Sequence, residues 1–261
     1  MKQIPNLFTL LNLVFGCLAI VFTLQQGILL LPLDGDGNIL TTPLQLQNTA
    51  EKIFLASLFI ALAAVVDFFD GFIARAFNAS SEMGKQLDSL ADVVSFGVAP
   101  SMIIYYFLRQ SMAQQSGSLN ASFLWLVPAF IIAAAAAYRL GKFNLDNSQS
   151  YGFKGVPTPA VGLLIASFPM IYWLTDSAVV TNLLLNQWFW YGIILLIAWL
   201  MVSSLPILAL KFKGFTPKNA MPFIIIAVVG VAAIFLLKWL AVPVIFITYV
   251  LVSLLFKNKT E

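Results

Sequence analysis

Apolar runs of about 17 residues or more recur along the whole chain, and they limit what it can fold into. In a bilayer every backbone polar group must find its partner within the protein, so spanning segments of this length are helices. Hydrophobic residues make up 61% of the 261 residues, and the mean hydropathy is +0.93. Charged residues make up 10%, too few to cover a globular surface. The sequence therefore predicts an all-α integral membrane protein, a polytopic helical bundle.

We interpret the chain as about eight transmembrane helices in a single membrane domain that spans residues 1–261. The first apolar run follows Met1 and Lys2 without a small-residue cleavage site, so we expect a retained helix rather than a signal peptide. Only Lys238 and Trp239 separate the last two runs, where a tight turn is preferred over one very long helix. The predicted spans lie near residues 7–25, 52–75, 86–108, 122–140, 157–174, 187–210, 220–237 and 239–256.

The distribution of cations predicts the orientation of these spans. Of the 14 lysines and arginines, all except Lys52, Arg109 and Lys238 fall on the side of the N-terminus. Cytoplasmic loops carry an excess of lysine and arginine in membrane proteins. We therefore expect both termini in the cytosol, together with the tip of the hairpin that residues 67–92 form.

The residue types that are missing or rare exclude several kinds of chemistry. The chain has no histidine, which removes histidine-based nucleophilic catalysis, histidine metal ligands and histidine proton relays. Its single cysteine, Cys17, allows neither an intramolecular disulfide nor a cysteine cluster for zinc. The net charge of +3 does not indicate a nucleic-acid partner, because the positive charges lie between the spans. Carboxylates, hydroxyls, lysine, arginine or a metal must therefore do the chemistry.

Four aspartates lie at helical spacing around the second and third spans. Asp67 and Asp70 are three residues apart near the end of one helix, and Asp88 and Asp92 are four apart near the start of the next. Each pair therefore occupies one helix face, and an antiparallel turn brings the two pairs to similar depth. One charged side chain in a bilayer helix costs roughly 2.5–3.5 kcal/mol, so four would cost about 10 kcal/mol if nothing compensated them.

A shared metal centre is the compensation that these four residues predict. Oxygen ligands favour Mg²⁺, Mn²⁺ or Ca²⁺, and four carboxylates can bridge two ions about 3.5–4 Å apart, an arrangement suited to phosphoryl chemistry. The alternative is a set of structural ion pairs between helices. Only Arg75 and Lys85 lie near enough in the sequence to neutralise four charges, so the metal site is preferred.

The same residues form the pattern D-x2-DG-x2-AR-x8-G-x3-D-x3-D, with all eight fixed positions present. This pattern resembles the signature of the CDP-alcohol phosphatidyltransferases. Further runs, which are spread over about two-thirds of the chain, look like the phosphatidylserine synthase branch of that family. Lys142 departs from the branch, which usually has arginine there, so the bidentate guanidinium fork is lost. The similar runs are residues 4–12, 88–100, 139–144 and 153–160.

The resemblance implies a role for each matched residue of the pattern. Asp67 and Asp88 would bridge two Mg²⁺ or Mn²⁺ ions, Asp70 would complete the first site and Asp92 the second. Asp92 would also be the catalytic base that takes the proton from the attacking hydroxyl. The residues that would contact the CDP part of the lipid donor are Asn6, Thr9, Gly71, Arg75 and Ser81.

The reaction that the resemblance implies is transfer of a phosphatidyl group from CDP-diacylglycerol to L-serine, with homodimerisation also implied. The serine carboxylate needs a cation near the metal-bound phosphate. Arg139, Lys142 and Lys154 lie on the cytosolic side between the fourth and fifth spans, although positive-inside anchoring accounts for them equally well. Glycerol 3-phosphate or inositol phosphate would also require cations, so both remain alternative acceptors.

Two other classes of membrane protein fit the aspartates less well. A divalent-cation transporter could bind a travelling ion with four carboxylates, but it needs access from both sides. All four carboxylates lie toward the cytosolic face, and discontinuous midplane helices are not evident. A structural scaffold leaves the four charges unexplained. The sequence therefore favours an enzyme.

Overall fold

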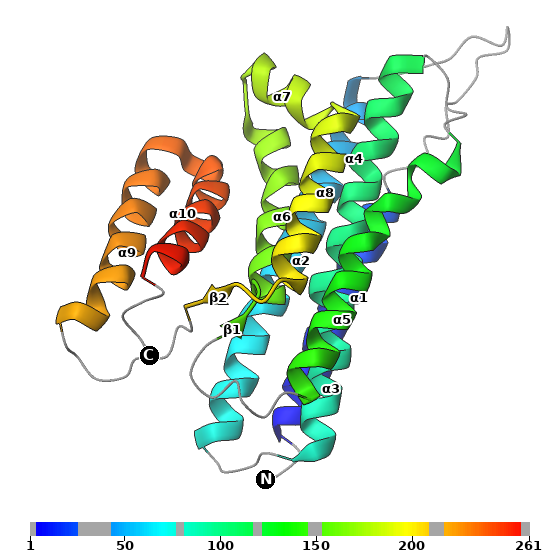
Figure 1. Ribbon diagram of the computed structural model, residues 1–261. Coiled ribbons are helices and arrows are strands. Elements are labelled where there is room, and N and C mark those ends of the chain that lie inside the picture. The colour runs from blue at the N-terminus through cyan, green and yellow to red at the C-terminus, as the bar shows by residue number, and fades with distance from the viewer. Residues whose placement is uncertain are drawn as a thin grey trace, which may run out of the picture.

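The computed structural model describes residues 4–25, 43–76, 81–116, 122–145, 153–208 and 217–256, which are almost entirely helical. Helices lie side by side along one direction, and two short strands form a small ribbon beside them (Figure 1). The elements are α1 (Ile4–Leu24), α2 (Pro43–Ala76), α3 (Glu82–Asp92), η2 (Val93–Val98), α4 (Ala99–Ser116), η3 (Phe123–Trp125), η4 (Val127–Phe130), α5 (Ile131–Leu145), β1 (Phe153–Lys154), α6 (Thr158–Leu174), α7 (Ala178–Leu184), α8 (Gln187–Val202), β2 (Pro206–Ile207), α9 (Pro217–Leu237), η5 (Lys238–Leu240) and α10 (Ala241–Leu255).

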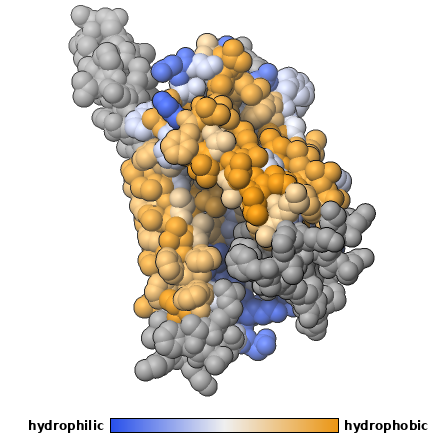
Figure 2. Space-filling view, turned by 90° about the vertical axis from the view of Figure 1, so that its left-hand side faces the viewer, coloured by the Kyte–Doolittle hydropathy of each residue, from blue (hydrophilic) through white to orange (hydrophobic). Residues whose placement is uncertain are grey.

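The described helices make this an all-α membrane protein. Five helical stretches are long and apolar enough to cross a bilayer, and the bent pair α7 and α8 would make a sixth if it forms one span. The surface agrees, because hydrophobic residues cover most of the face in Figure 2 and hydrophilic residues gather toward its upper and lower ends. The more detailed prediction of eight spans stays a prediction, because α6 has only 17 residues and α9 with α10 counts as one stretch.

Two predicted boundaries can be compared directly with the helices. The predicted span 187–210 is too long, because α8 ends at Val202. Pro206 lacks an N–H to continue a helix, and the chain there pairs as a strand instead. The predicted tight turn at Lys238 is confirmed, since Lys238 has φ +51° and the two flanking helices pack against each other (Figure 1).

An aromatic cluster holds together the half of the bundle opposite the four aspartates. Trp190 at the start of α8 is fully buried, stacks on Phe107 at 4.9 Å and meets Phe168 edge-on at 5.2 Å. Its indole N–H donates to the carbonyl of Leu184 at 2.6 Å, so its one polar group is satisfied. The start of α8 lies at the upper end of the bundle in Figure 1, whereas the end of α2 and the start of α3 lie at its lower end.

Helix α1 is the element that positions the polar region, because it packs against α2, α3 and η2. Its contact with η2 is unusually close. A Cβ atom added at Gly16 would lie 2.4 Å from Ser95 Oγ and 2.8 Å from Ser95 Cα, so only glycine fits. Ser95 Oγ also donates to the carbonyl of Asn12 at 3.0 Å. These contacts fix the depth of α1 beside the aspartates.

The segment η2 is a π-helix set between α3 and α4. The amide of Ala99 bonds to the carbonyl of Val94, five residues earlier, instead of four as in an α-helix. Short π segments of this kind occur frequently at functional sites. This one begins directly after Asp92, and α1, α5 and α6 all pack against it.

A two-stranded antiparallel ribbon joins the start of α6 to the chain that follows α8. Phe153 pairs with Ile207, and Lys154 pairs with Pro206. Gly155, which follows β1, has φ +78°, and a Cβ atom there would lie 2.3 Å from the carbonyl oxygen of Met201. The left-handed backbone and the lack of space both require glycine at this position.

Candidate active site

Three of the four predicted carboxylates meet at one point between α2 and α3. One carboxylate oxygen from each of Asp67, Asp70 and Asp88 lies within 4.8 Å of the others. The spacing of three residues puts Asp67 and Asp70 on one face of α2, and α3 brings Asp88 from the neighbouring helix. The structure therefore gathers these side chains as the sequence predicts.

The donor set of this cluster fits a hard divalent cation. The Oδ1 atom of Asp88 is buried and has no hydrogen-bond partner among the described residues, and Asp70 is buried as well. Buried carboxylates at this separation repel one another unless a positive charge lies between them. Carboxylate oxygens without protein partners are the ligands that Mg²⁺ and Mn²⁺ prefer.

Asp92 lies beside this cluster without belonging to it. It is buried at the C-terminal end of α3, four residues beyond Asp88, and it interacts electrostatically with the other three carboxylates. Asn12 Nδ2 donates to Asp92 Oδ1 at 3.3 Å. Asp92 is thus held by a neutral amide, which leaves its carboxylate available as a proton acceptor.

Helix α1 supplies a hydrogen bond to two of the four carboxylates. Thr9 Oγ1 lies 2.8 Å from Asp70 Oδ2 and 3.1 Å from the carbonyl of Pro5, so its single proton is shared between them. Asn12, one turn further along, contacts Asp92. Sequence reasoning gave Asn12 no role, although a polar residue on the same face as Thr9 in an apolar helix is a usable signal.

Several residues predicted to contact the CDP-lipid gather at the start of α3. Ser81 is the N-cap of α3, because its Oγ accepts from the amide of Gly84 at 3.0 Å. A Cβ atom at Gly84 would lie 3.0 Å from Asn6 Oδ1, so Asn6 and Ser81 flank the same glycine. A Cβ at Gly71 would meet nothing within 4 Å, and the side chain of Arg75 lies outside the described part of the structure.

The predicted acceptor residues are divided between buried and exposed positions. Arg139 is buried, and its Nη1 donates to Thr158 Oγ1 at 3.0 Å. Its Nε is buried without a partner among the described residues, and Arg139 interacts electrostatically with Asp92. Lys142 is exposed, whereas the side chain of Lys154 in β1 lies outside the described residues.

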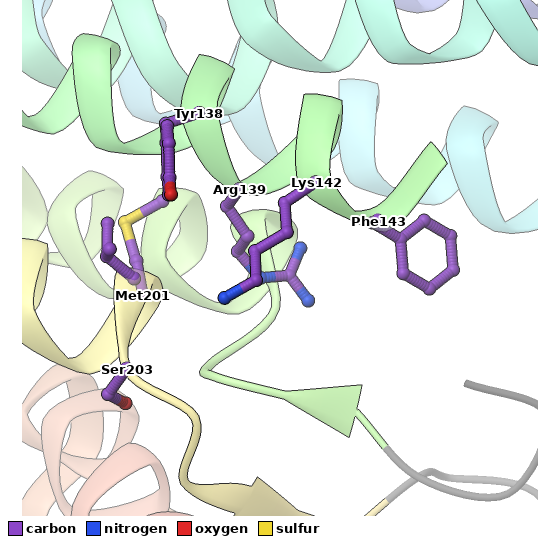
Figure 3. Close-up of a pocket in the computed structure, with 7 residues that line it drawn as sticks. Tyr138, Arg139, Lys142, Phe143, Met201 and Ser203 are labelled. Carbon is purple, nitrogen blue, oxygen red and sulfur yellow. The ribbon is translucent and has the colours of Figure 1, made fainter. Parts of the chain in front are cut away.

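A small pocket separates Arg139 and Lys142 from the end of α8. Figure 3 shows both side chains extending from α5 toward the same side, while Phe143 points away from them. Met201 and Ser203 close the pocket at the C-terminal end of α8. The pocket is lined by Tyr138, Arg139, Lys142, Phe143, Met201, Val202 and Ser203.

Curated proteins that this chain resembles carry one shared description. It is 32% identical over 172 residues to the CDP-diacylglycerol–serine O-phosphatidyltransferase of Bacillus subtilis, covering 66% of this chain and 78% of that protein. Proteins of the same description from Helicobacter pylori (strain J99) and Methanocaldococcus jannaschii are 28% and 37% identical over 163 and 109 residues. Those two matches cover 62% and 42% of this chain, but only 54% and 47%, about half, of the relatives.

The family comparison covers most of the chain. The sequence model of the CDP-alcohol phosphatidyltransferase family matches residues 2–202, a range that includes α1, the four aspartates and every residue lining the pocket beside Arg139 except Ser203. It ends at the last residue of α8, so α9 and α10 lie beyond it. From this match, and from the convergence of the carboxylates at its centre, the chain belongs to the CDP-alcohol phosphatidyltransferase family.

Proposed function

We propose that this protein transfers a phosphatidyl group from CDP-diacylglycerol to L-serine, giving phosphatidylserine and CMP. The observation that carries the proposal is the partly buried carboxylate cluster of Asp67, Asp70 and Asp88, which lies beside Asp92. One oxygen of Asp88 has no hydrogen-bond partner among the described residues, and Asp92 accepts a hydrogen bond from the Asn12 amide. The family match and the relatives' shared description support the reaction class and the acceptor.

The four aspartates would hold the metal of this reaction, with Asp67 and Asp88 between two Mg²⁺ or Mn²⁺ ions, Asp70 on the first and Asp92 on the second. When bound, the ions neutralise the diphosphate and stabilise the charge that develops at phosphorus. Asp92 also takes the proton of the serine hydroxyl. The hydroxyl oxygen then forms its bond to the lipid-side phosphorus while the bond from that phosphorus to CMP breaks. No covalent intermediate with the protein is required.

The donor's CDP group is proposed to lie at the start of α3. Asn6 and Ser81 offer polar groups beside Gly84, and the open space over Gly71 allows a ligand to approach the backbone. Arg75, at the end of α2, is the cation proposed for the diphosphate. Thr9 lies one helical turn from Asn6 and is the remaining residue proposed to contact CDP. This contact would be made in addition to the hydrogen bond between Thr9 and Asp70.

The serine carboxylate is proposed to bind near Arg139, with Lys142 and Lys154 as further cations. The Nε of Arg139 has no hydrogen-bond partner among the described residues, and Arg139 also interacts electrostatically with Asp92, the proposed base. A carboxylate bound there would present the serine hydroxyl on the side of Asp92. The preference for serine over glycerol 3-phosphate or inositol phosphate would follow from the size and charge of this region.

We further propose a cell-membrane location with the active site at the cytosolic face, eight spans and both termini in the cytosol. The excess of lysine and arginine on the side of the N-terminus supports this orientation. A single domain over residues 1–261 and a homodimer complete the proposal, the homodimer from the family resemblance alone.

A headgroup competition in detergent micelles tests the function. Purified protein receives CDP-diacylglycerol, Mn²⁺ or Mg²⁺, and labelled L-serine, glycerol 3-phosphate or inositol phosphate in parallel, and CMP and lipid products are measured. CMP release that depends on serine, with labelled phosphatidylserine, is the expected result. Release with another acceptor would retain the carboxylate site and reject the serine pocket, and no release from folded protein would favour cation transport.

Metal dependence is tested in the same assay with excess chelator. Activity should stop and return when Mg²⁺ or Mn²⁺ is added beyond the chelator concentration, because four neighbouring carboxylates cannot bind a diphosphate without cations. Undiminished activity in chelator would contradict the metal mechanism.

A further inference from the structure

The last helix of the chain fixes a backbone segment near the acceptor region with two side chains. Tyr249 and Ser253 are four residues apart on α10 and therefore share a helix face. The Tyr249 hydroxyl donates to the carbonyl of Leu208 at 2.9 Å, and Ser253 Oγ accepts from the amide of Leu208 at 3.3 Å. Both backbone groups of one residue are thus bound by one helix.

The hydroxyl of Ser253 is used fully in this arrangement. It donates its proton to the carbonyl of Tyr249 at 2.7 Å, which leaves its lone pairs to accept the amide of Leu208. Ser253 is buried, so these bonds replace water that the site excludes. The contact is a specific polar attachment rather than apolar packing alone.

Leu208 directly follows β2, and the ribbon β1–β2 needs an attachment of this kind. A two-stranded ribbon is only marginally stable by itself. Figure 1 places the ribbon between the main bundle and the pair α9–α10, and α10 contacts β2. On the bundle side, the amides of Gly155 and Val156 bond to the carbonyls of Leu205 and Leu200 at 2.9 and 3.1 Å. The ribbon is therefore held from both sides.

The ribbon leads within a few residues to the groups proposed to bind the acceptor. Lys154 is in β1, and Thr158, four residues later, accepts the hydrogen bond from Arg139. Tyr249 is also close enough to Arg139 for an electrostatic interaction between them. Helix α10 can therefore affect the position of Arg139 in two ways: through the ribbon that leads to Thr158, and through the direct interaction of Tyr249 with Arg139.

We propose that α10, through Tyr249 and Ser253, positions the acceptor-binding region, so that the last two helices contribute to acceptor affinity although they lie beyond the family match. Tyr249 and Ser253 are positioning residues here, acting through Leu208 and Arg139. The proposal rests on the proposed location of the acceptor site. The CDP-lipid region at the start of α3 receives no such attachment from α10 in the described residues.

Two single variants, Tyr249→Phe and Ser253→Ala, test this proposal by comparing their effects on KM for the acceptor and on KM for CDP-diacylglycerol. The variants should raise KM for the acceptor about two- to tenfold each, the range of one neutral hydrogen bond, while KM for CDP-diacylglycerol stays unchanged. Tyr191→Phe is the matched control for Tyr249→Phe. The Tyr191 hydroxyl also donates to a backbone carbonyl at 2.9 Å, but that carbonyl belongs to Trp125, which is not part of the ribbon. Thr248→Val is the control for Ser253→Ala, since Thr248 bonds only to its own helix at Val244.

Hydrogen exchange followed by mass spectrometry gives a second readout that needs no activity. Amides of residues 153–156, 158, 205, 207 and 208 should exchange faster in Tyr249→Phe than in wild type, and at the wild-type rate in Tyr191→Phe. Unchanged exchange there, or KM values for both substrates that shift together, would overturn the proposal. If the wild type uses an acceptor other than serine, the proposed function fails, and the same KM comparison is made with that acceptor.

Discussion

Replacing Asn12 tests whether the site depends on the amide that holds Asp92. Asn12 is fully buried, donates to Asp92 at 3.3 Å, and is itself anchored where Ser95 donates to its carbonyl. A hydrogen bond to a charged group contributes about 1.5–3 kcal/mol. Because 3.3 Å exceeds the usual 2.9–3.0 Å, the lower end applies, about 1.5 kcal/mol. That corresponds to roughly a tenfold loss of kcat if Asp92 is the base.

Two substitutions at this position separate the hydrogen bond from packing. Asn12→Ala removes the amide and leaves space, whereas Asn12→Leu removes it but keeps a side chain with the same branching and the same number of heavy atoms. Both should lower kcat about tenfold, since both remove the same hydrogen bond. The leucine variant should lose less thermal stability than the alanine variant, because both lose the hydrogen bond to Asp92 but only alanine leaves a cavity at this fully buried position.

The assay measures serine-dependent CMP release with saturating CDP-diacylglycerol, alongside a thermal unfolding curve for each variant. Thr23→Val is the control on the same helix, because the buried Thr23 hydroxyl donates only to the carbonyl of Ala19 at 2.8 Å. If both Asn12 variants are folded and keep kcat within twofold of wild type, the amide does not position Asp92 and the reasoning is wrong.

Three further substitutions test other parts of the site. Asp92→Asn should abolish turnover but leave the protein folded and able to bind CDP-diacylglycerol, measured by CMP release and a lipid-binding titration; a near-normal rate would remove Asp92 as the base. Thr9→Val should raise the Mn²⁺ concentration for half-maximal activity about tenfold, since Asp70 loses a bond worth about 1.5 kcal/mol, whereas Thr9→Ser should not. Gly155→Ala should lower the free energy of unfolding by more than about 1 kcal/mol and so lower the melting temperature. Gly192→Ala should not, because a Cβ atom there meets nothing within 4 Å.

The parts of this structure that follow from local spacing could be predicted from the sequence. The separations within the pairs Asp67–Asp70 and Asp88–Asp92 fix each pair on a helix face. The cap at Ser81 follows from its chemistry, and apolar length alone predicts helices. Each of these features depends on a few neighbouring residues, which a single sequence displays directly.

The partners of the carboxylates could not be predicted, because they depend on packing between distant segments. Asn12 and Asp92 are 80 residues apart, and their contact requires α1 to lie against η2 at the depth that Gly16 allows. The bond from Arg139 to Thr158 likewise depends on where the ribbon places the start of α6. No periodic pattern of one helix contains this information.

The π-helix η2 has a consequence for how this site could change or be transplanted. A π-turn contains one residue more than an α-turn, and each residue rotates a helix by about 100°. The six residues Val93–Val98 therefore determine the angle about the helix axis between the Asp92 side chain and the buried face of α4, which includes Ile103 and Phe107. Deleting one of them would give an unbroken α-helix and keep that apolar face near its present angle, whereas straightening the segment without a deletion would rotate the face by about 100° away from the carboxylates. A designer who grafts the four aspartates and the α4 face onto another helical hairpin must therefore either keep the π segment or, on a regular helix, leave one of its residues out.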